Sequence, residues 1–91
     1  MKSSLRVTVS GKVQGVFYRS TAQEVADKLD LTGYVRNLED GSVEIFAEGD
    51  KEKLTKLRDW CSKGPKGAKV NDMQFEWGEF SGTFKNFIIR H

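Results

Sequence analysis

Hydrophobic and polar residues alternate near the start of the chain. Leu5, Val7 and Val9 are separated by Arg6 and Thr8, and this period of two predicts a strand with one buried face. Four further segments predict strands: 31–38, 43–47, 70–78 and a short last one from Phe84 or Phe87 to Arg90. In the segment 70–78, Met73, Phe75 and Trp77 share one face.

A period close to four replaces the alternation in two places and predicts helices. In the first helix the apolar face consists of Ala22, Val25, Ala26 and Leu29, spaced i, i+3, i+4, i+7. Ser20 and Gln23 resemble a capping box for this helix, although the helix could begin a few residues earlier.

The second predicted helix has clear signals at both ends. Asp50 is a favourable N-cap residue, and Gly64-Pro65 predicts the helix exit, because glycine adopts the left-handed conformation and proline cannot continue the hydrogen-bond ladder. One side of this helix is apolar: Leu54, Leu57, Trp60 and Cys61.

The resulting order is strand, helix, strand, strand, helix, strand and a short extra last strand. This order predicts an α+β fold of the ferredoxin-like βαββαβ type. Right-handed crossovers place both helices on one face of an antiparallel sheet and leave the other face open to solvent or a partner. No linker or low-complexity segment interrupts residues 1–91, so we expect a single domain.

Composition excludes several classes of protein. The chain has 91 residues, of which 37% are hydrophobic and 31% charged, as in an ordinary globular domain. No apolar run approaches a membrane span and no secretory signal pattern is present, so we expect a cytoplasmic protein without a membrane partner. A net charge of +2 argues neither for nor against nucleic acid, and we interpret the basic run over 51–69 as a solvated helix face and loop.

Common catalytic arrangements lack their residues. His91 is the only histidine, and at the frayed end of the chain it is expected to lie outside any site, so histidine-dependent nucleophilic catalysis and a histidine-ligated zinc site are disfavoured. Cys61 is the only cysteine and is expected in the core. No P-loop lysine follows Gly15, which argues against nucleotide hydrolysis. We expect no metal and no cofactor.

The segment Gly11 to Ser20 is the strongest candidate site. A glycine-bearing turn leads from a strand into a helix and carries Arg19, and a helix start offers unpaired N–H groups and a positive dipole end to an anion. Asn37 follows the second strand. Because the first and second strands lie one crossover apart, Arg19 and Asn37 can face the same pocket.

These segments resemble the acylphosphatase family over essentially the whole chain, including Gly64-Pro65 after the second helix. The residues that carry the resemblance form two motifs in the right order, and the glycines that follow them also match: Gly11, Val13, Gln14, Gly15, Val16, Tyr18, Arg19; Gly33, Tyr34, Val35, Arg36, Asn37; Gly41, Val43 and Gly49. Two departures are Phe17, at a variable place in the loop, and the ending Arg90-His91, where some members end in an aromatic residue.

The resemblance implies an enzyme that hydrolyses acyl phosphates to a carboxylate and inorganic phosphate without a metal. The family's catalytic arginine and asparagine fall on Arg19 and Asn37, so we expect Arg19 to grip the phosphoryl group and Asn37 to hold the attacking water. The substrate-binding residues are then expected to be those of the loop: Gly15, Val16, Phe17, Tyr18 and Arg19. Phosphate is the expected product and inhibitor, and the protein is expected to be a monomer.

The alternative is a binding module that does no chemistry. Ferredoxin-like sheets also bind RNA on their open face and small anionic ligands in regulatory domains. The segment 43–47 lacks the paired exposed aromatic residues of an RNA-recognition strand, which argues against RNA. A domain for a small anionic ligand stays open from fold alone, but it would not explain why Arg19 and Asn37 occur together.

Overall fold

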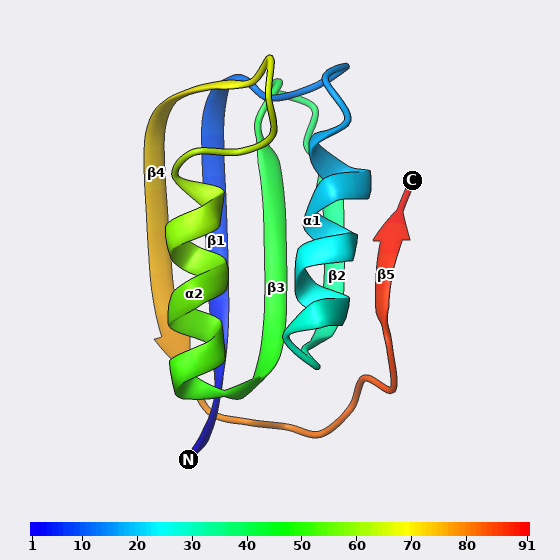
Figure 1. The fold of residues 1–91 in the computed structure, drawn as a ribbon, viewed down its shortest axis with the longest axis vertical. Helices are drawn as coiled ribbons and strands as arrows, with labels where there is room; N and C mark the ends of the chain where they lie inside the picture. Colours follow the sequence, from blue (N-terminus) through cyan, green and yellow to red (C-terminus); the bar gives the residue numbers. More distant parts are fainter.

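The computed structural model describes residues 1–91 and contains two helices and five strands (Figure 1). The predicted order of elements is confirmed, and most bounds differ from the predicted ones by only a few residues. The elements are β1 (Lys2–Lys12), α1 (Tyr18–Lys28), β2 (Thr32–Asn37), β3 (Val43–Asp50), α2 (Lys51–Cys61), β4 (Lys69–Gly78) and β5 (Phe87–Arg90).

The strands form one sheet in the order β4-β1-β3-β2-β5, and both helices cover the same face of it (Figure 1). The pairs β4–β1, β1–β3 and β3–β2 are antiparallel, which confirms the ferredoxin-like arrangement. β5 runs parallel to β2, with Gly33 opposite Phe87 and Arg36 opposite Arg90, so the sheet is mixed. This parallel pairing brings the end of β5 to the end of β2, where Asn37 lies.

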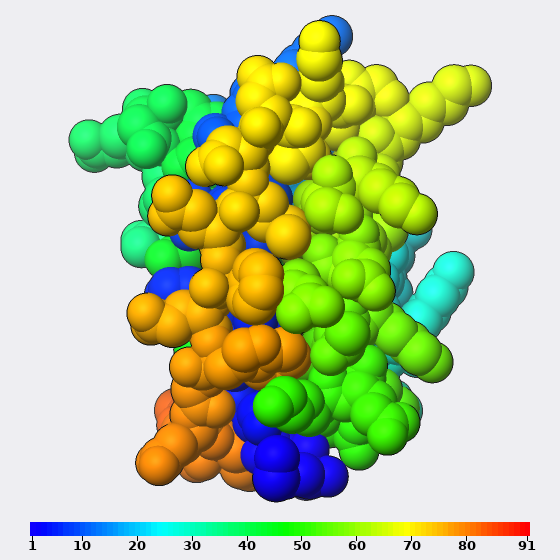
Figure 2. Space-filling model, turned by 90° about the vertical axis from the view of Figure 1, so that its left-hand side faces the viewer, coloured from blue at the N-terminus to red at the C-terminus, as the bar shows by residue number.

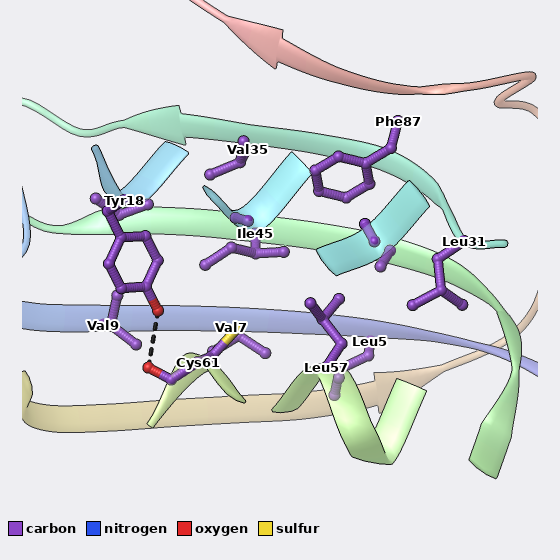
Figure 3. Close-up of a cluster of buried hydrophobic side chains, with 14 of the residues drawn as sticks. Leu5, Val7, Val9, Tyr18, Leu31, Val35, Ile45, Leu57, Cys61 and Phe87 are labelled. Atoms are coloured by element: carbon purple, nitrogen blue, oxygen red, sulfur yellow. Dashed lines mark hydrogen bonds between the residues drawn. The ribbon is translucent and has the colours of Figure 1, made fainter. Parts of the chain in front are cut away.

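The core lies between the helices and the sheet (Figure 3). The alternating residues of β1 and β3 that were predicted to be buried are fully buried, including Leu5, Val7, Val9 and Ile45. Cys61 is also fully buried, as expected, and burial raises the pKa of its thiol to about 12. The core therefore accounts for the only cysteine as a packing residue.

The opposite face of the sheet carries a compact ionic network. Glu44 accepts hydrogen bonds from Arg36 Nε (2.7 Å), Arg6 Nη1 (2.9 Å) and the Tyr34 hydroxyl (3.0 Å). Burial alone would raise the pKa of Glu44, but these hydrogen bonds outweigh burial and the net effect is a lowered pKa. The face left open by the helices is thus tied across β1, β2 and β3.

A second buried carboxylate fixes the connection between β4 and β5. Glu48 is 1% exposed and accepts hydrogen bonds from the backbone N–H groups of Ser81 (2.8 Å) and Gly82 (3.1 Å). The connection passes the lower ends of the strands from one edge of the sheet to the other (Figure 1). Glu48 therefore helps to guide the chain to its place beside β2.

One edge of the sheet is formed by β4, which lies beside α2 (Figure 2), and the other by β5. Met73, Phe75 and Trp77 pair with Val9, Val7 and Leu5 of β1, so they share the helix-facing side as predicted. Met73 and Trp77 pack against the core, whereas Phe75 stays 46% exposed beneath the Arg58 guanidinium, 4.8 Å from its ring centroid.

The two helices begin differently. The Asp50 prediction is confirmed, because its carboxylate accepts a hydrogen bond from the Glu52 N–H at 2.9 Å. The capping box at Ser20 and Gln23 is wrong: α1 begins at Tyr18, Ser20 Oγ donates to the Phe17 carbonyl, and Gln23 Nε2 donates to the Phe87 carbonyl. The left-handed backbone of Phe17 starts the helix before Ser20, which leaves both side chains inside it.

Candidate active site

The loop between β1 and α1 presents a series of backbone N–H groups. Gly15 has φ 75° and Phe17 has φ 62°, both in the left-handed region. None of the N–H groups from Gly15 to Ser20 donates a hydrogen bond within the chain. Successive N–H groups in a turn of this kind form a concave anion site, and here they continue into the positive end of a helix dipole.

Arg19 is the second residue of α1, so the helix start sets the position of its guanidinium. Its side chain is half-buried, and Nη1 donates to His91 Nδ1 at 3.3 Å. A guanidinium has five N–H donors in a planar fork, so this one bond orients the group and leaves the other donors for a ligand. Arg19 is therefore held in place without being neutralised by a carboxylate.

Asn37 is the last residue of β2 and is exposed. Its amide makes no hydrogen bond within the chain, so one acceptor and two donors are free to bind water or a ligand. Gln14 ties the hairpin next to Asn37 to the loop: Gln14 Nε2 donates to the carbonyls of Leu38 and Ser42, both at 2.9 Å. In the sequence Gln14 stands out only as a member of the motif, with no predicted role.

Arg19 and Asn37 line the same open cavity, of about 330 Å³, as their places in the topology predicted. Gly15, Phe17 and Tyr18 also line it, whereas the half-buried Val16 packs against the core and does not. The full lining is Val13, Gly15, Phe17, Tyr18, Arg19, Ser20, Asn37, Ile89 and His91.

Tyr18 fixes the cavity to the core. Its side chain is 1% exposed, and its hydroxyl donates to the Cys61 carbonyl at 2.8 Å (Figure 3). The centroid of its ring lies 5.1 Å from that of the Trp60 ring. Burial and the contact with Cys61 raise the pKa of Tyr18 far above its usual range. The phenol is therefore a packing and positioning group that joins the start of α1 to the end of α2.

The expectation that His91 lies outside the site is wrong. Pairing of β5 with β2 brings Ile89 and His91 to the cavity. Arg90 lies opposite Arg36, so the next residue of each segment, His91 and Asn37, lies at the same end of the sheet. The sequence offered no signal for this placement, because a last strand can join either edge of a sheet. The imidazole accepts a hydrogen bond from Arg19, while the hydroxyl of Ser20, which lines the same cavity, donates to the Phe17 carbonyl.

Two other kinds of feature are absent from the chain. No group of three or more His, Cys, Asp or Glu side chains is arranged to hold a metal ion. No helix has the length and apolar character needed to cross a membrane.

Comparison with known proteins identifies the family. The acylphosphatase family model matches residues 5–89. The chain belongs to the acylphosphatase family. An acylphosphatase of Pelotomaculum thermopropionicum is 46% identical over 88 residues, which cover 97% of this chain and 96% of the relative.

Two solved acylphosphatase structures agree with this family assignment. The acylphosphatase of Bacillus subtilis is 35% identical with a TM-score of 0.93, and the match covers 100% of both chains. The acylphosphatase of Coxiella burnetii is 38% identical with a TM-score of 0.92, and the match covers 98% of this chain and 93% of that one. The resemblance drawn from the two motifs is thus confirmed, and the family relationship indicates a hydrolase.

Proposed function

We propose that this protein hydrolyses the carboxyl-phosphate bond of acyl phosphates to a carboxylate and inorganic phosphate. The observation that carries the proposal is that Arg19 and Asn37, from α1 and β2, line one cavity whose loop presents unpaired N–H groups. The names of the family and its relatives support the same activity.

In the proposed complex the phosphoryl group lies against the loop. Two of its oxygens accept hydrogen bonds from the Arg19 fork, and the N–H groups from Gly15 to Arg19 surround the same anion. Gly15 suits this role, since its φ is 75° and a side chain there would project into open space instead of the core. Binding energy and charge stabilisation then come mainly from groups fixed before the substrate arrives.

Asn37 positions the nucleophile. Its amide holds a water in line with the phosphorus, opposite the acyl oxygen, but is too weak a base to take a proton from it. The water oxygen forms the new bond to phosphorus, the bond to the acyl oxygen breaks, and its electron pair leaves with the carboxylate. The proton passes from the water to a phosphoryl oxygen, so that a carboxylate and dihydrogen phosphate result.

The leaving group explains why so few residues are needed. A carboxylate departs without protonation, so no general acid is required, and phosphoryl transfer depends mainly on positioning and charge stabilisation. We propose that the reaction uses no metal and no cofactor. Inorganic phosphate carries the same anionic head as the substrate, so it should inhibit competitively.

We also propose that the protein acts as a cytoplasmic monomer without a nucleic-acid partner. The net charge is only +2, and the open sheet face is partly neutralised by the Glu44 network. Sedimentation of the purified protein at micromolar concentration should give a single species of 10.3 kDa. A stable dimer would contradict the monomer.

The test of the function is hydrolysis of benzoyl phosphate in excess chelator. The wild type should turn over between about pH 5 and 8, with phosphate competitive, and Arg19→Ala should lose at least about 10²-fold in kcat/KM. Arg19→Lys should not restore the activity, because an ammonium lacks the planar fork. Arg58→Ala is the matched control, since Arg58 lies on α2 against the ring of Phe75. Absence of chelator-resistant turnover would reject the proposal.

A further inference from the structure

Phe17 has a backbone conformation that an aromatic residue rarely adopts. It is one of only two non-glycine residues with positive φ, and the other is Asp30. Aspartate tolerates the left-handed region, whereas a bulky side chain there is strained. Three hydrogen bonds to the Phe17 carbonyl hold the conformation: Thr21 Oγ1 donates at 2.8 Å, Thr21 N at 3.1 Å and Ser20 Oγ at 3.2 Å.

This conformation turns the Phe17 side chain into solvent. Phe17 is 81% exposed, while the next residue, Tyr18, is 1% exposed and Val16 packs on the core. No other ring and no cation of the chain stacks on the Phe17 ring. Packing therefore does not account for a phenylalanine at a position whose φ suits glycine.

The surroundings of Phe17 give the ring a use. It lines the cavity that holds Arg19 and Asn37, together with the apolar side chains of Val13 and Ile89. The polar groups of this cavity suit a phosphoryl group. A phosphoryl group bound to them does not account for the apolar part of the wall. An acyl phosphate is bound at its phosphoryl end, so its acyl group extends from the loop past this wall.

Resting on the proposed function, we propose that Phe17 is the specificity residue for the acyl group and that the natural substrate carries an aromatic or extended apolar acyl chain. The exposed ring stacks on an aromatic acyl group, and Ile89 contacts it from β5. A small acyl group such as acetyl offers the ring only one methyl group, so it buries much less apolar surface there than an aromatic acyl group. The left-handed loop thus aims an apolar surface at the substrate and the N–H groups at its phosphate.

The experiment compares kcat/KM for benzoyl phosphate and acetyl phosphate in the wild type and in Phe17→Gly and Phe17→Asn. Glycine and asparagine both suit the left-handed backbone, so each variant keeps the loop geometry without the ring. The benzoyl to acetyl ratio should fall about tenfold in both variants, because ring stacking and burial of the acyl group favour only the aromatic substrate. Phe75→Thr, which changes an exposed ring on β4, should keep the wild-type ratio.

The outcomes separate this inference from the proposed function. If the wild type hydrolyses both substrates and the ratio does not change in the two Phe17 variants, the acyl specificity is wrong and the hydrolase stands. If the losses are equal for both substrates, Phe17 acts only through the loop and the inference is also wrong. If the wild type hydrolyses neither substrate, the proposed function fails and this inference fails with it.

Discussion

Replacing Tyr18 with phenylalanine removes one hydroxyl group from the junction between α1 and α2. That hydroxyl donates to the Cys61 carbonyl at 2.8 Å, and Cys61 is the last residue of α2. No backbone N–H group donates to the Cys61 carbonyl. Tyr18 therefore caps one of the carbonyls that every helix leaves unpaired at its C-terminal end. The Tyr18→Phe substitution would leave a buried acceptor without a partner while it keeps the ring contact with Trp60.

The expected loss follows from these contacts. An unsatisfied buried carbonyl costs about 1–3 kcal/mol, and the substitution creates no large cavity because the ring stays. With about 2 kcal/mol as the central value and about 4–8 °C per kcal/mol for a domain of this size, Tm should fall by roughly 8–16 °C. Thermal unfolding and urea titration, both followed by circular dichroism, measure the change.

Tyr34→Phe is the matched control. Tyr34 is also buried, at 7% exposed, and its hydroxyl donates to Glu44 and accepts from Arg6. Without that hydroxyl Glu44 keeps Arg6 and Arg36 as donors, and Arg6 keeps Glu44 as its acceptor. The free energy of unfolding of Tyr34→Phe should therefore fall by less than about 1 kcal/mol. A Tyr18→Phe variant that is destabilised no more than Tyr34→Phe would refute the capping argument.

Alkaline pH gives Tyr18→Phe a second readout. The pKa of Tyr18 is raised on folding by burial and by the contact with Cys61, so its contribution to stability is present below about pH 10, the usual tyrosine value, and lost as pH rises. The free energy of unfolding of the wild type should therefore fall more steeply above this pH than that of Tyr18→Phe. Equal slopes would contradict the raised pKa.

Three further predictions concern other parts of the fold. Gln14→Ala should lower kcat at least severalfold and Tm by only a few degrees, because both carbonyls that Gln14 binds keep another donor; equal kcat in the variant would contradict the positioning role. The pKa of Glu44 is lowered on folding, so its contribution to stability is present above about pH 4.5 and lost as pH falls. In urea titrations the free energy of unfolding should therefore fall less steeply below this pH in Glu44→Gln than in the wild type, and equal slopes would count against the network. Cys61 should react with a thiol reagent at pH 8 about 10³-fold more slowly than in urea, and fast reaction in the native protein would contradict its burial.

Local signals in the sequence were sufficient for most elements. Alternation in β1 and β3 and the cap at Asp50 depend on neighbouring residues, so they could be read directly. The meeting of Arg19 and Asn37 followed from topology, since a βαβ unit brings a helix start and a strand end to one edge. The helix begins a few residues before Ser20, as the sequence allowed, but the predicted capping box was wrong because the left-handed backbone of Phe17, and no side-chain cap, precedes the first turn of α1.

Features that depend on distant segments could not be predicted. Pairing of β5 with the free edge of β2, which brings His91 to Arg19, depends on a long connection held by Glu48. Gln14 binds Leu38 and Ser42 across more than twenty residues, and no local period marks such a contact. These two contacts orient the site, whereas the residues proposed to do the chemistry were already visible in the motifs.

The central claim is that Arg19 holds the phosphoryl group and Asn37 holds the water. Steady-state kinetics of Asn37→Ala with benzoyl phosphate, with phosphate as competitive inhibitor, test it most directly. We predict an inhibition constant for phosphate close to that of the wild type and a kcat lower by about 10²-fold or more, because only the positioned water is lost. Equal losses in phosphate binding and in kcat would contradict the division of roles between Arg19 and Asn37.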